Sequence, residues 1–286
     1  MNRKIELLAS YWTLAGDCYA MGPSEVATFP LQDRVEAAAW AGYTGMGFAH
    51  QDLLVAKENI GYAAMKRLLD DHGIVHIEVE FLGDWFTAGA KKQASDLIRL
   101  DLLEAAHALG ARNIKVAGEM WTEVCDVPRY AEAFADVCAD AARIGTGVAI
   151  EILPMTNIRK LEIATAILEQ AGHENGGLCI DIWHFLRGGI DVERIAKLPL
   201  QYVKSVEIDD ARAEITGTIW EDTLFHRLYP GEGVFDCPAF IRSVEATGFR
   251  GAYGVEVINE VYRKLPLREQ AKRSFDGAMA QFAKIA

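Results

Sequence analysis

The sequence predicts an α/β protein, a single (β/α)8 barrel domain that spans residues 1–286. Three observations support this fold class. Short apolar runs of β-forming residues recur eight times, and stretches with helical periodicity lie between them. The runs begin about every 25 to 50 residues, a spacing that suits consecutive strand–helix units. No G-x-G-x-x-G motif follows the first strand, which argues against a doubly wound open sheet.

The elements follow one another in a regular order. The expected strands cover residues 7–14, 44–48, 74–81, 113–117, 147–152, 177–182, 202–208 and 252–257, each a short apolar run. The expected helices cover residues 32–41, 62–71, 91–109, 129–143, 159–171, 192–196, 238–247 and 267–283. Strands and helices that alternate in this way form a parallel sheet with right-handed crossovers.

Composition limits the possible partners. The chain has 41 Asp and Glu against 29 Lys and Arg, a net charge of −12. This balance argues against nucleic acid or an anionic membrane as the main partner, because such binding needs a basic face. Its apolar runs are too short to span a bilayer or to form a signal peptide. The five cysteines include no C-x-x-C pair and are expected to be reduced thiols. We expect a cytoplasmic protein that acts on a small molecule.

Four successive strands end in an acidic residue. These residues are Glu151, Asp181, Glu207 and Glu256, and a small residue stands two positions before each of them. Because side chains alternate along a strand, each acid shares the inner face of the barrel with that small residue. Four carboxylates at one rim need a counter-charge, and oxygen ligands favour Mg²⁺ or Mn²⁺. The alternative is that they are ordinary acids in salt bridges or helix caps.

Further polar residues are expected inside the barrel or at its rim. Glu78, Glu80 and Lys115 alternate with apolar residues on the third and fourth strands, which places them inward. Lys115 either neutralises Glu78 or takes part in catalysis. His184 follows Asp181 by three residues, so it is either a metal ligand or a residue that orients a carboxylate.

Other residues near strand ends are candidates for contact with a substrate. His50 and His226 are expected near the rim. Trp12 and Trp121 offer aromatic faces on which the C–H face of a sugar ring can stack, although packing in the core is the commoner role for such residues.

These residues resemble those of the sugar phosphate isomerase/epimerase family, the xylose isomerase-like (AP endonuclease family 2) TIM barrels. The resemblance covers essentially the whole chain and is most specific in the second half. Its motifs are Glu151, the segment IDIWHFLR with Asp181 and His184, the segment VEIDDAR with Glu207, and a PGEGVFD turn before Glu256.

The resemblance implies a divalent metal held by Glu151, Asp181, Glu207 and Glu256. Mn²⁺ or Mg²⁺ is expected, with Co²⁺ or Zn²⁺ as alternatives. Most members have His where this chain has Glu207. This departure leaves two possibilities: Glu207 is itself a ligand, or it is displaced and His184 supplies a nitrogen ligand.

The resemblance also implies functional roles. Glu151 and Glu256 would move a proton between opposite faces of the substrate, with His184 as a further acid or base. Arg212 corresponds to an arginine that holds substrate oxygens. Apart from the resemblance, Arg227 is a further candidate for contact with the substrate. A homodimer or homotetramer is expected.

Several reactions fit this site. The first is isomerisation or epimerisation of a small sugar or keto-polyol, in which a proton next to a carbonyl is removed and a metal-stabilised enediolate forms. The alternative is a dehydratase or lyase that eliminates a β-hydroxyl or a glycosidic oxygen.

An abasic-site endonuclease would need a histidine-rich metal cluster and a basic face. A sugar-binding barrel without activity would need no excess of inward acids.

Overall fold

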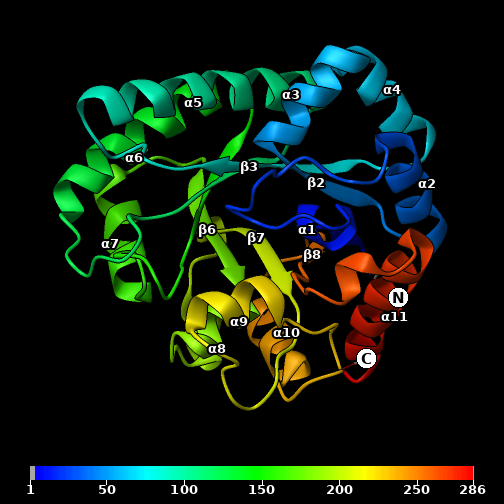
Figure 1. Cartoon of the computed structure of the whole chain (residues 1–286). Helices are drawn as coiled ribbons and strands as arrows, with labels where there is room; N and C mark the ends of the chain where they lie inside the picture. Colours follow the sequence, from blue (N-terminus) through cyan, green and yellow to red (C-terminus); the bar gives the residue numbers. More distant parts are fainter. Residues whose placement is uncertain (1–3, 286) are drawn as a thin grey trace.

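The computed structural model describes residues 4–285, and its centre is a closed barrel of eight parallel strands (Figure 1). Each strand pairs with its neighbours in sequence, and the last closes the barrel on the first. The strands are β1 (Leu7–Ala9), β2 (Gly45–Ala49), β3 (His76–Leu82), β4 (Asn113–Val116), β5 (Gly147–Glu151), β6 (Gly176–Asp181), β7 (Val203–Ile208) and β8 (Tyr253–Val255). The predicted (β/α)8 fold is confirmed.

Helices surround the barrel (Figure 1). The longer ones are α2 (Leu31–Ala41), α3 (His50–Asn59), α4 (Tyr62–Asp71), α5 (Gly89–Leu109), α6 (Val127–Ala142), α7 (Leu161–Ala171), α10 (Cys237–Ala246) and α11 (Leu267–Ala283). Three short helices are α1 (Tyr11–Leu14), α8 (Ile182–Arg187) and α9 (Ile219–Phe225). The 3-10 helices are η1 (Val192–Lys197), η2 (Leu200–Tyr202) and η3 (Tyr262–Lys264).

Alternation along the strands separates the two faces of the barrel wall. On β5, Val148 and Ile150 belong to the large apolar core between the barrel and the helices, whereas Ala149 and Glu151 do not. The same division holds on β6, where Leu178 and Ile180 belong to that core. The strand-end acids therefore lie on the inner face, as their spacing predicts.

The first expected strand, residues 7–14, is wrong in its second half. β1 ends at Ala9, and Tyr11–Leu14 form the short helix α1. Tyr11 and Trp12 pack in a separate apolar cluster at the rim, with Ala49 and Ile258, and not in the core around the barrel. Apolar residues occur on both sides of the change from strand to helix, because those of β1 pack in the core around the barrel and Tyr11 and Trp12 pack in the rim cluster. The sequence therefore does not show where the strand ends.

Three other expectations need correction. The helices α3, α8 and α9 were not expected, and residues 192–196 lie in a 3-10 helix. Strict alternation from the inward Glu78 and Glu80 would place Phe81 on the outer face of β3, but Phe81 lines the inner pocket. The pairing of β3 with β4 shifts between Val79 and Leu82, so Leu82 takes the place in the core. An irregularity of this kind moves the following side chain to the other face.

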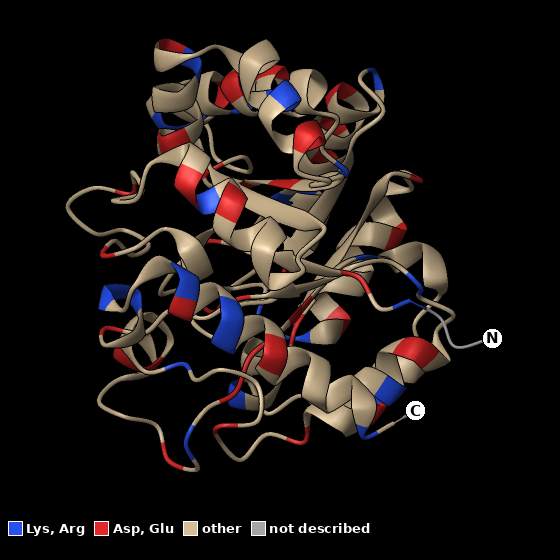
Figure 2. Cartoon of the chain, turned by 90° about the vertical axis from the view of Figure 1, so that its right-hand side faces the viewer, with Lys and Arg blue, Asp and Glu red and all other residues tan. Residues whose placement is uncertain are grey.

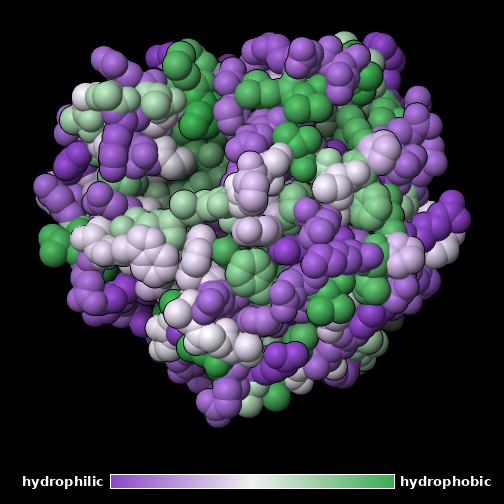
Figure 3. All heavy atoms as spheres, in the orientation of Figure 1, coloured by the Kyte–Doolittle hydropathy of each residue, from purple (hydrophilic) through white to green (hydrophobic). Residues whose placement is uncertain are grey.

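The outer surface is polar and mixed in charge. Figure 2 shows Lys and Arg residues separated by acidic residues along the outer helices. Figure 3 shows hydrophobic groups interspersed with hydrophilic residues over the face that it presents. In the part of the chain that is described, no helix combines the length and the apolar character needed to cross a membrane.

Candidate active site

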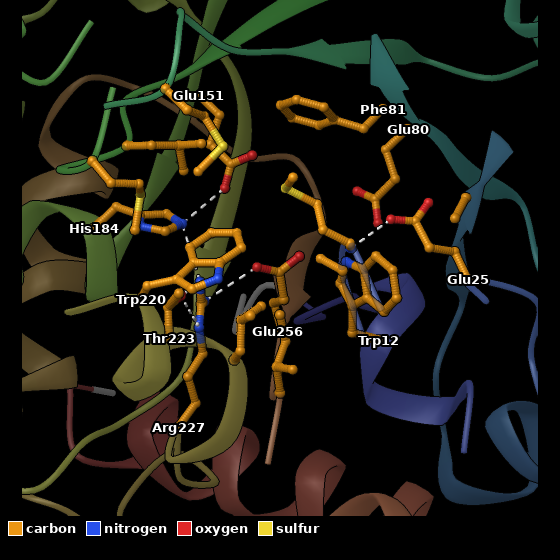
Figure 4. Close-up of a pocket in the computed structure, with 18 residues that line it drawn as sticks. Trp12, Glu25, Glu80, Phe81, Glu151, His184, Trp220, Thr223, Arg227 and Glu256 are labelled. Atoms are coloured by element: carbon orange, nitrogen blue, oxygen red, sulfur yellow. Dashed lines mark hydrogen bonds and ion pairs between the residues drawn. The ribbon is translucent and has the colours of Figure 1, made fainter. Parts of the chain in front are cut away.

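A pocket of about 150 Å³ opens at the carboxyl ends of the barrel strands (Figure 4). Its polar lining includes Glu80, Glu151, His184, Arg227 and Glu256. Its apolar walls include Trp12, Phe81, Met120, Leu153, Met155 and Trp220. Functional residues of (β/α)8 proteins lie at this end of the barrel, because the loops after the strands meet there.

Three of the four predicted metal ligands come together in this pocket. Glu151 ends β5, Asp181 ends β6, and Glu256 directly follows β8. One ligand atom from each of them lies within 4.8 Å of the others and of an imidazole nitrogen of His184. All four side chains are buried. The structure thus assembles three carboxylates and one imidazole from three different strand ends.

His184 joins this group because of how α8 begins. Asp181 is the N-cap of that helix, and its Oδ1 accepts a hydrogen bond from the backbone N–H of His184 at 3.1 Å. This cap holds the third residue of the first turn next to the carboxylate. The Nε2 atom of His184 then lies 3.1 Å from Oε1 of Glu151.

Glu207, the fourth predicted ligand, lies apart from this group. Its Oε1 accepts hydrogen bonds from Nζ of Lys115 at 2.6 Å and from the hydroxyl of Ser10. Its Oε2 is 3.2 Å from Sγ of Cys179. Glu207 and Cys179 form an adjoining group with Glu151. In this geometry His184, and not Glu207, shares a group with Glu151, Asp181 and Glu256.

Lys115 points inward as expected, but Glu78 is not its main partner. Nζ of Lys115 lies 2.6 Å from Glu207, 2.9 Å from Glu80 and 3.9 Å from Glu78. Glu78 instead accepts a hydrogen bond from Nε of Arg112 at 2.6 Å. Lys115 therefore neutralises acids within the lumen, and every partner it has there is a carboxylate.

Arg227 is the second cation of the site, and it is fully buried. Its Nη1 lies 2.9 Å from Oδ2 of Asp181, 2.9 Å from Oδ2 of Asp209 and 3.1 Å from Oε2 of Glu256. Its Nη2 lies 3.0 Å from Nε2 of His184 (Figure 4). Contact between Arg227 and the substrate stays a prediction. In the structure, these protein groups already engage its guanidinium.

Burial and neighbouring charges act against each other in this site. Burial raises the pKa of Glu207, Asp209 and Glu256, and the nearby acids raise the pKa of Glu256 further. Burial also raises the pKa of Glu80, to about 7, although Lys115 opposes it. Burial alone would raise the pKa of Asp181, but Arg227 and His184 hold it below its usual value.

The donor atoms fit a divalent cation. A guanidinium can only donate hydrogen bonds, so Nε2 of His184 accepts from Arg227 and carries a lone pair. Oε1 of Glu151 directs a second lone pair toward the same nitrogen from 3.1 Å. Oxygen and nitrogen lone pairs that converge in this way form a typical ligand set for a divalent metal. The acids also outnumber the cations here, which favours an additional positive charge.

The remaining predicted substrate-binding residues lie in different places. Trp12 lines the pocket. His50 pairs through Nε2 with Asp101 at 2.9 Å and does not line it. Trp121 is exposed at the rim. Its ring and that of Trp220 form an edge-to-face pair with 5.8 Å between the ring centroids.

Arg212 also lies outside the pocket. Its side chain is exposed, and its backbone carbonyl accepts a hydrogen bond from Arg187. His226 makes a backbone bridge with Asn259 next to the strand ends.

Two further acids belong to the candidate site but were not among its predicted residues. Glu80 was expected inside the barrel but was not assigned to the site, and it lines the pocket opposite His184 (Figure 4). Asp209 binds Arg227, although it lies two residues beyond the predicted acid Glu207. The alternation of β7 carried a usable signal, because residues two apart share a face.

Comparisons with known proteins show the family and the fold. Residues 35–280 match the family model described as a xylose isomerase-like TIM barrel. A 3-dehydroshikimate dehydratase from Pseudomonas aeruginosa is 26% identical over 244 residues, 84% of this chain and 38% of the dehydratase. An inosose isomerase from Bacillus velezensis is 26% identical over 156 residues, 54% of this chain and 55% of the isomerase. The chain thus spans less than two thirds of the length of either relative in these matches.

Solved structures share the architecture. The structure of the IOLI protein with a bound zinc atom superimposes with a TM-score of 0.83 at 17% identity, over 99% of both chains. An L-ribulose 3-epimerase superimposes with a TM-score of 0.72 at 17% identity, over 98% of this chain and 97% of its own. With a closed eight-stranded barrel and a family match over most of its length, this chain belongs to the xylose isomerase-like TIM barrel family.

Proposed function

We propose that the protein is a divalent-metal-dependent isomerase or epimerase of an uncharged small sugar or keto-polyol. The observation that carries this proposal is the convergence of Glu151, Asp181, His184 and Glu256 on one point of the pocket. A soluble sugar-binding module would have no need to bring so many acids together in a buried place. Its curated relatives include inosose isomerases, which act on a substrate class of this kind.

These four residues are the ones that would hold the metal. A bound divalent ion would act as a Lewis acid that polarises the substrate carbonyl and stabilises the enediolate. Oxygen and nitrogen donors of this kind suit Mn²⁺ or Mg²⁺, with Co²⁺ and Zn²⁺ as alternatives. A homo-oligomer and a cytoplasmic location complete the proposal, and all five cysteines are free thiols.

Glu151 and Glu256 are the proposed acid and base. They come from β5 and from the end of β8, so they reach the pocket from different parts of the rim (Figure 4). One carboxylate can take the proton next to the carbonyl, and the other can return a proton to the opposite face. The Nε2 atom of His184 lies 3.1 Å from Glu151, and we assign it to the metal as a nitrogen ligand rather than to the proton as a further acid or base.

The charge of the pocket favours an uncharged substrate. Among the residues that line it, Arg227 is the one permanent cation, and protein acceptors occupy its guanidinium. A substrate carboxylate or phosphate would instead meet Glu25, Glu80 and the strand-end acids. Like charges of this kind repel an anionic group, so we place neutral polyols ahead of acids and phosphate esters.

Elimination of water is the second candidate reaction, and Glu80 is the observation that favours it. Its carboxyl lies across the pocket from His184, and Oε1 has no hydrogen-bond partner (Figure 4). With a pKa of about 7, this group can hold a proton at neutral pH and give it to a departing hydroxyl. One of the matched relatives is a dehydratase.

Proton exchange separates these reactions. The protein would be incubated with Mn²⁺ in D₂O with ketoses and inososes, and NMR would follow the proton next to the carbonyl. We expect exchange that stops when a chelator is added, with all oxygens of the substrate retained. Loss of water or of an aglycone would instead establish the elimination.

A matched pair of variants makes the test specific. Glu151→Gln should abolish the exchange, whereas Glu169→Gln, an exposed acid on α7, should leave it unchanged. If the metal-loaded protein exchanged no proton with any neutral polyol but did so with a carboxylate or a phosphate ester, the proposed substrate class would be wrong.

A further inference from the structure

We propose that Arg227 is a resident cation that competes with the divalent metal for the donor atoms of the site, and so sets the affinity of the protein for metal. This inference rests on the metal site of the proposed function. It concerns a residue that is predicted from the sequence to contact the substrate. The geometry gives this guanidinium a different task.

One guanidinium engages three of the four candidate ligands. Nη1 of Arg227 contacts Oδ2 of Asp181 at 2.9 Å and Oε2 of Glu256 at 3.1 Å. Nη2 contacts Nε2 of His184 at 3.0 Å. These residues contribute atoms to the group that could hold a metal. The side chain thus supplies positive charge at the place where a metal ion would supply it.

Arg227 is fixed in this position by residues outside the donor group. Thr223 accepts hydrogen bonds from Nε at 3.2 Å and from Nη2 at 2.8 Å. Asp209 accepts one from Nη1 at 2.9 Å. The guanidinium also stacks over the indole of Trp183, 5.1 Å from the ring centroid. A planar cation with fixed donors and a stacking partner is strongly preorganised.

Metal and guanidinium cannot both use the same lone pair. A neutral imidazole nitrogen has one lone pair, and on His184 that pair accepts a hydrogen bond from Arg227. Coordination of a metal by Nε2 therefore requires Nη2 to withdraw. Two cations within a few ångströms of each other also repel in a buried site, where water screens them poorly. Both effects weaken the binding of metal.

The same contacts keep the site assembled before metal binds. Without a cation, the buried carboxylates of Asp181, Asp209 and Glu256 would repel one another. Arg227 compensates for part of that charge, so the pocket is preformed in the metal-free protein. Competition between Arg227 and the metal therefore leaves the metal-free protein stable but lowers its affinity for the metal.

The experiment measures metal affinity directly, without using activity. Mn²⁺ binding to the metal-free full chain would be measured by equilibrium dialysis and by calorimetry. Arg227→Met removes the charge and every donor but keeps an unbranched side chain. We expect it to bind Mn²⁺ about tenfold more tightly than the wild type, because a competing charge is lost. Its thermal unfolding temperature should also rise more on addition of Mn²⁺ than that of the wild type.

The control is Arg187→Met. Arg187 is another nearly buried arginine, but it pairs with Asp222 and with backbone carbonyls and does not contact the candidate ligands. Its removal should reduce stability and leave the affinity for Mn²⁺ unchanged. An equal gain in affinity in both variants would overturn the proposal, because the effect would then come from overall charge.

A milder variant covers the case in which Arg227→Met does not fold. Thr223→Val keeps the shape of the side chain but removes the acceptor for two of the guanidinium donors. It should tighten Mn²⁺ binding by about threefold, since Arg227 is then easier to displace. Unchanged or weaker binding in both variants would show that Arg227 supports the ligands and does not compete with the metal. Tighter binding without any proton exchange would support this inference while contradicting the proposed reaction.

Discussion

At the scale of single residues, Glu207 is a strand-end acid that lies apart from the proposed metal ligands. It ends the same sequence pattern as Glu151, Asp181 and Glu256, yet Lys115 and Ser10 occupy one of its oxygens. A buried ion pair of this kind depends on both partners, because the remaining charge is left without compensation when one is removed. The pattern of the acids is therefore common to all four strands, but their roles differ.

A pair of substitutions separates the two roles. Glu256→Gln should weaken Mn²⁺ binding and lower the rate of proton exchange by about 10²- to 10⁴-fold, because it removes a ligand and a proposed base. Glu207→Gln should reduce the free energy of unfolding by about 3–5 kcal/mol, because Lys115 stays charged and buried. It should leave Mn²⁺ affinity nearly unchanged. Dialysis and urea unfolding measure the two effects, and loss of metal from Glu207→Gln would reinstate Glu207 as a ligand.

Glu80 gives the site a pH dependence. Its pKa in the folded protein is about 7, above the usual value of 4.5 for the unfolded chain. The folded state therefore binds this proton more tightly, and the wild type loses that stability as the pH rises from 4.5 through 7. Glu80→Gln does not titrate, so its stability relative to the wild type should improve between pH 5 and pH 8. Urea unfolding at both values measures the difference.

Glu78 on the same strand serves as the control for that prediction. Burial raises its pKa, but Arg112 and Lys115 outweigh burial and hold it below the usual value. Its contribution to stability is present above pH 4.5 and is lost only when the pH falls through its folded-state pKa. Glu78→Gln should therefore show no change relative to the wild type between pH 5 and pH 8. A change as large as that of Glu80→Gln would contradict the assignment.

At the scale of elements, the loop after β7 is organised by Asp210. Its carboxylate accepts hydrogen bonds from the backbone N–H groups of Gly231 at 3.0 Å, Gly233 at 2.9 Å and Phe235 at 2.8 Å. A Cβ atom at Gly233 would lie 2.2 Å from the carbonyl oxygen of Ala211. The P-G-E-G turn therefore needs glycine there, so that its backbone can approach the carboxylate.

Asp210→Ala should loosen this turn. Three backbone donors in residues 231–235, together with the N–H of Ala211, lose a charged acceptor, so the free energy of unfolding should fall by about 3 kcal/mol. Amide hydrogen exchange at residues 231–235 should become faster, since the loop opens more easily. Asp236→Ala, which removes the N-cap of α10, should cost only about 1 kcal/mol. Equal losses in the two variants would mean that Asp210 acts as an ordinary cap.

At the scale of the whole molecule, metal should stabilise the fold. A ligand that binds only the folded state at 100 times its dissociation constant adds about 2.7 kcal/mol. For a domain of this size, that raises the midpoint of thermal unfolding by about 5 °C. Calorimetry with Mn²⁺ and then with a chelator should show a reversible shift, and Glu256→Gln should show none. An equal shift in that variant would place the metal elsewhere.

The sequence was sufficient for the barrel and for the inward direction of the acids, because both follow from alternation within a few residues. It was not sufficient for the pairing of charges. Whether Glu207 binds a metal or a lysine depends on Lys115, which reaches it from a strand some 90 positions earlier. The place of Arg227 depends on α9 and on Trp183, and the Thr218–Glu221 capping box of α9 marks where the helix begins but not which residues it meets. Contacts between distant segments decided the details of the site.

The pairing of Lys115 with Glu207 limits the order in which the two positions can change during evolution. If Glu207 became histidine first, Lys115 would keep its charge with one anion fewer around it. If Lys115 were lost first, Glu207 would become a free anionic donor beside Glu151, a change that a bound cation can compensate. The second route passes through folded intermediates only where metal is plentiful. The two positions are therefore more readily exchanged as a pair than one at a time.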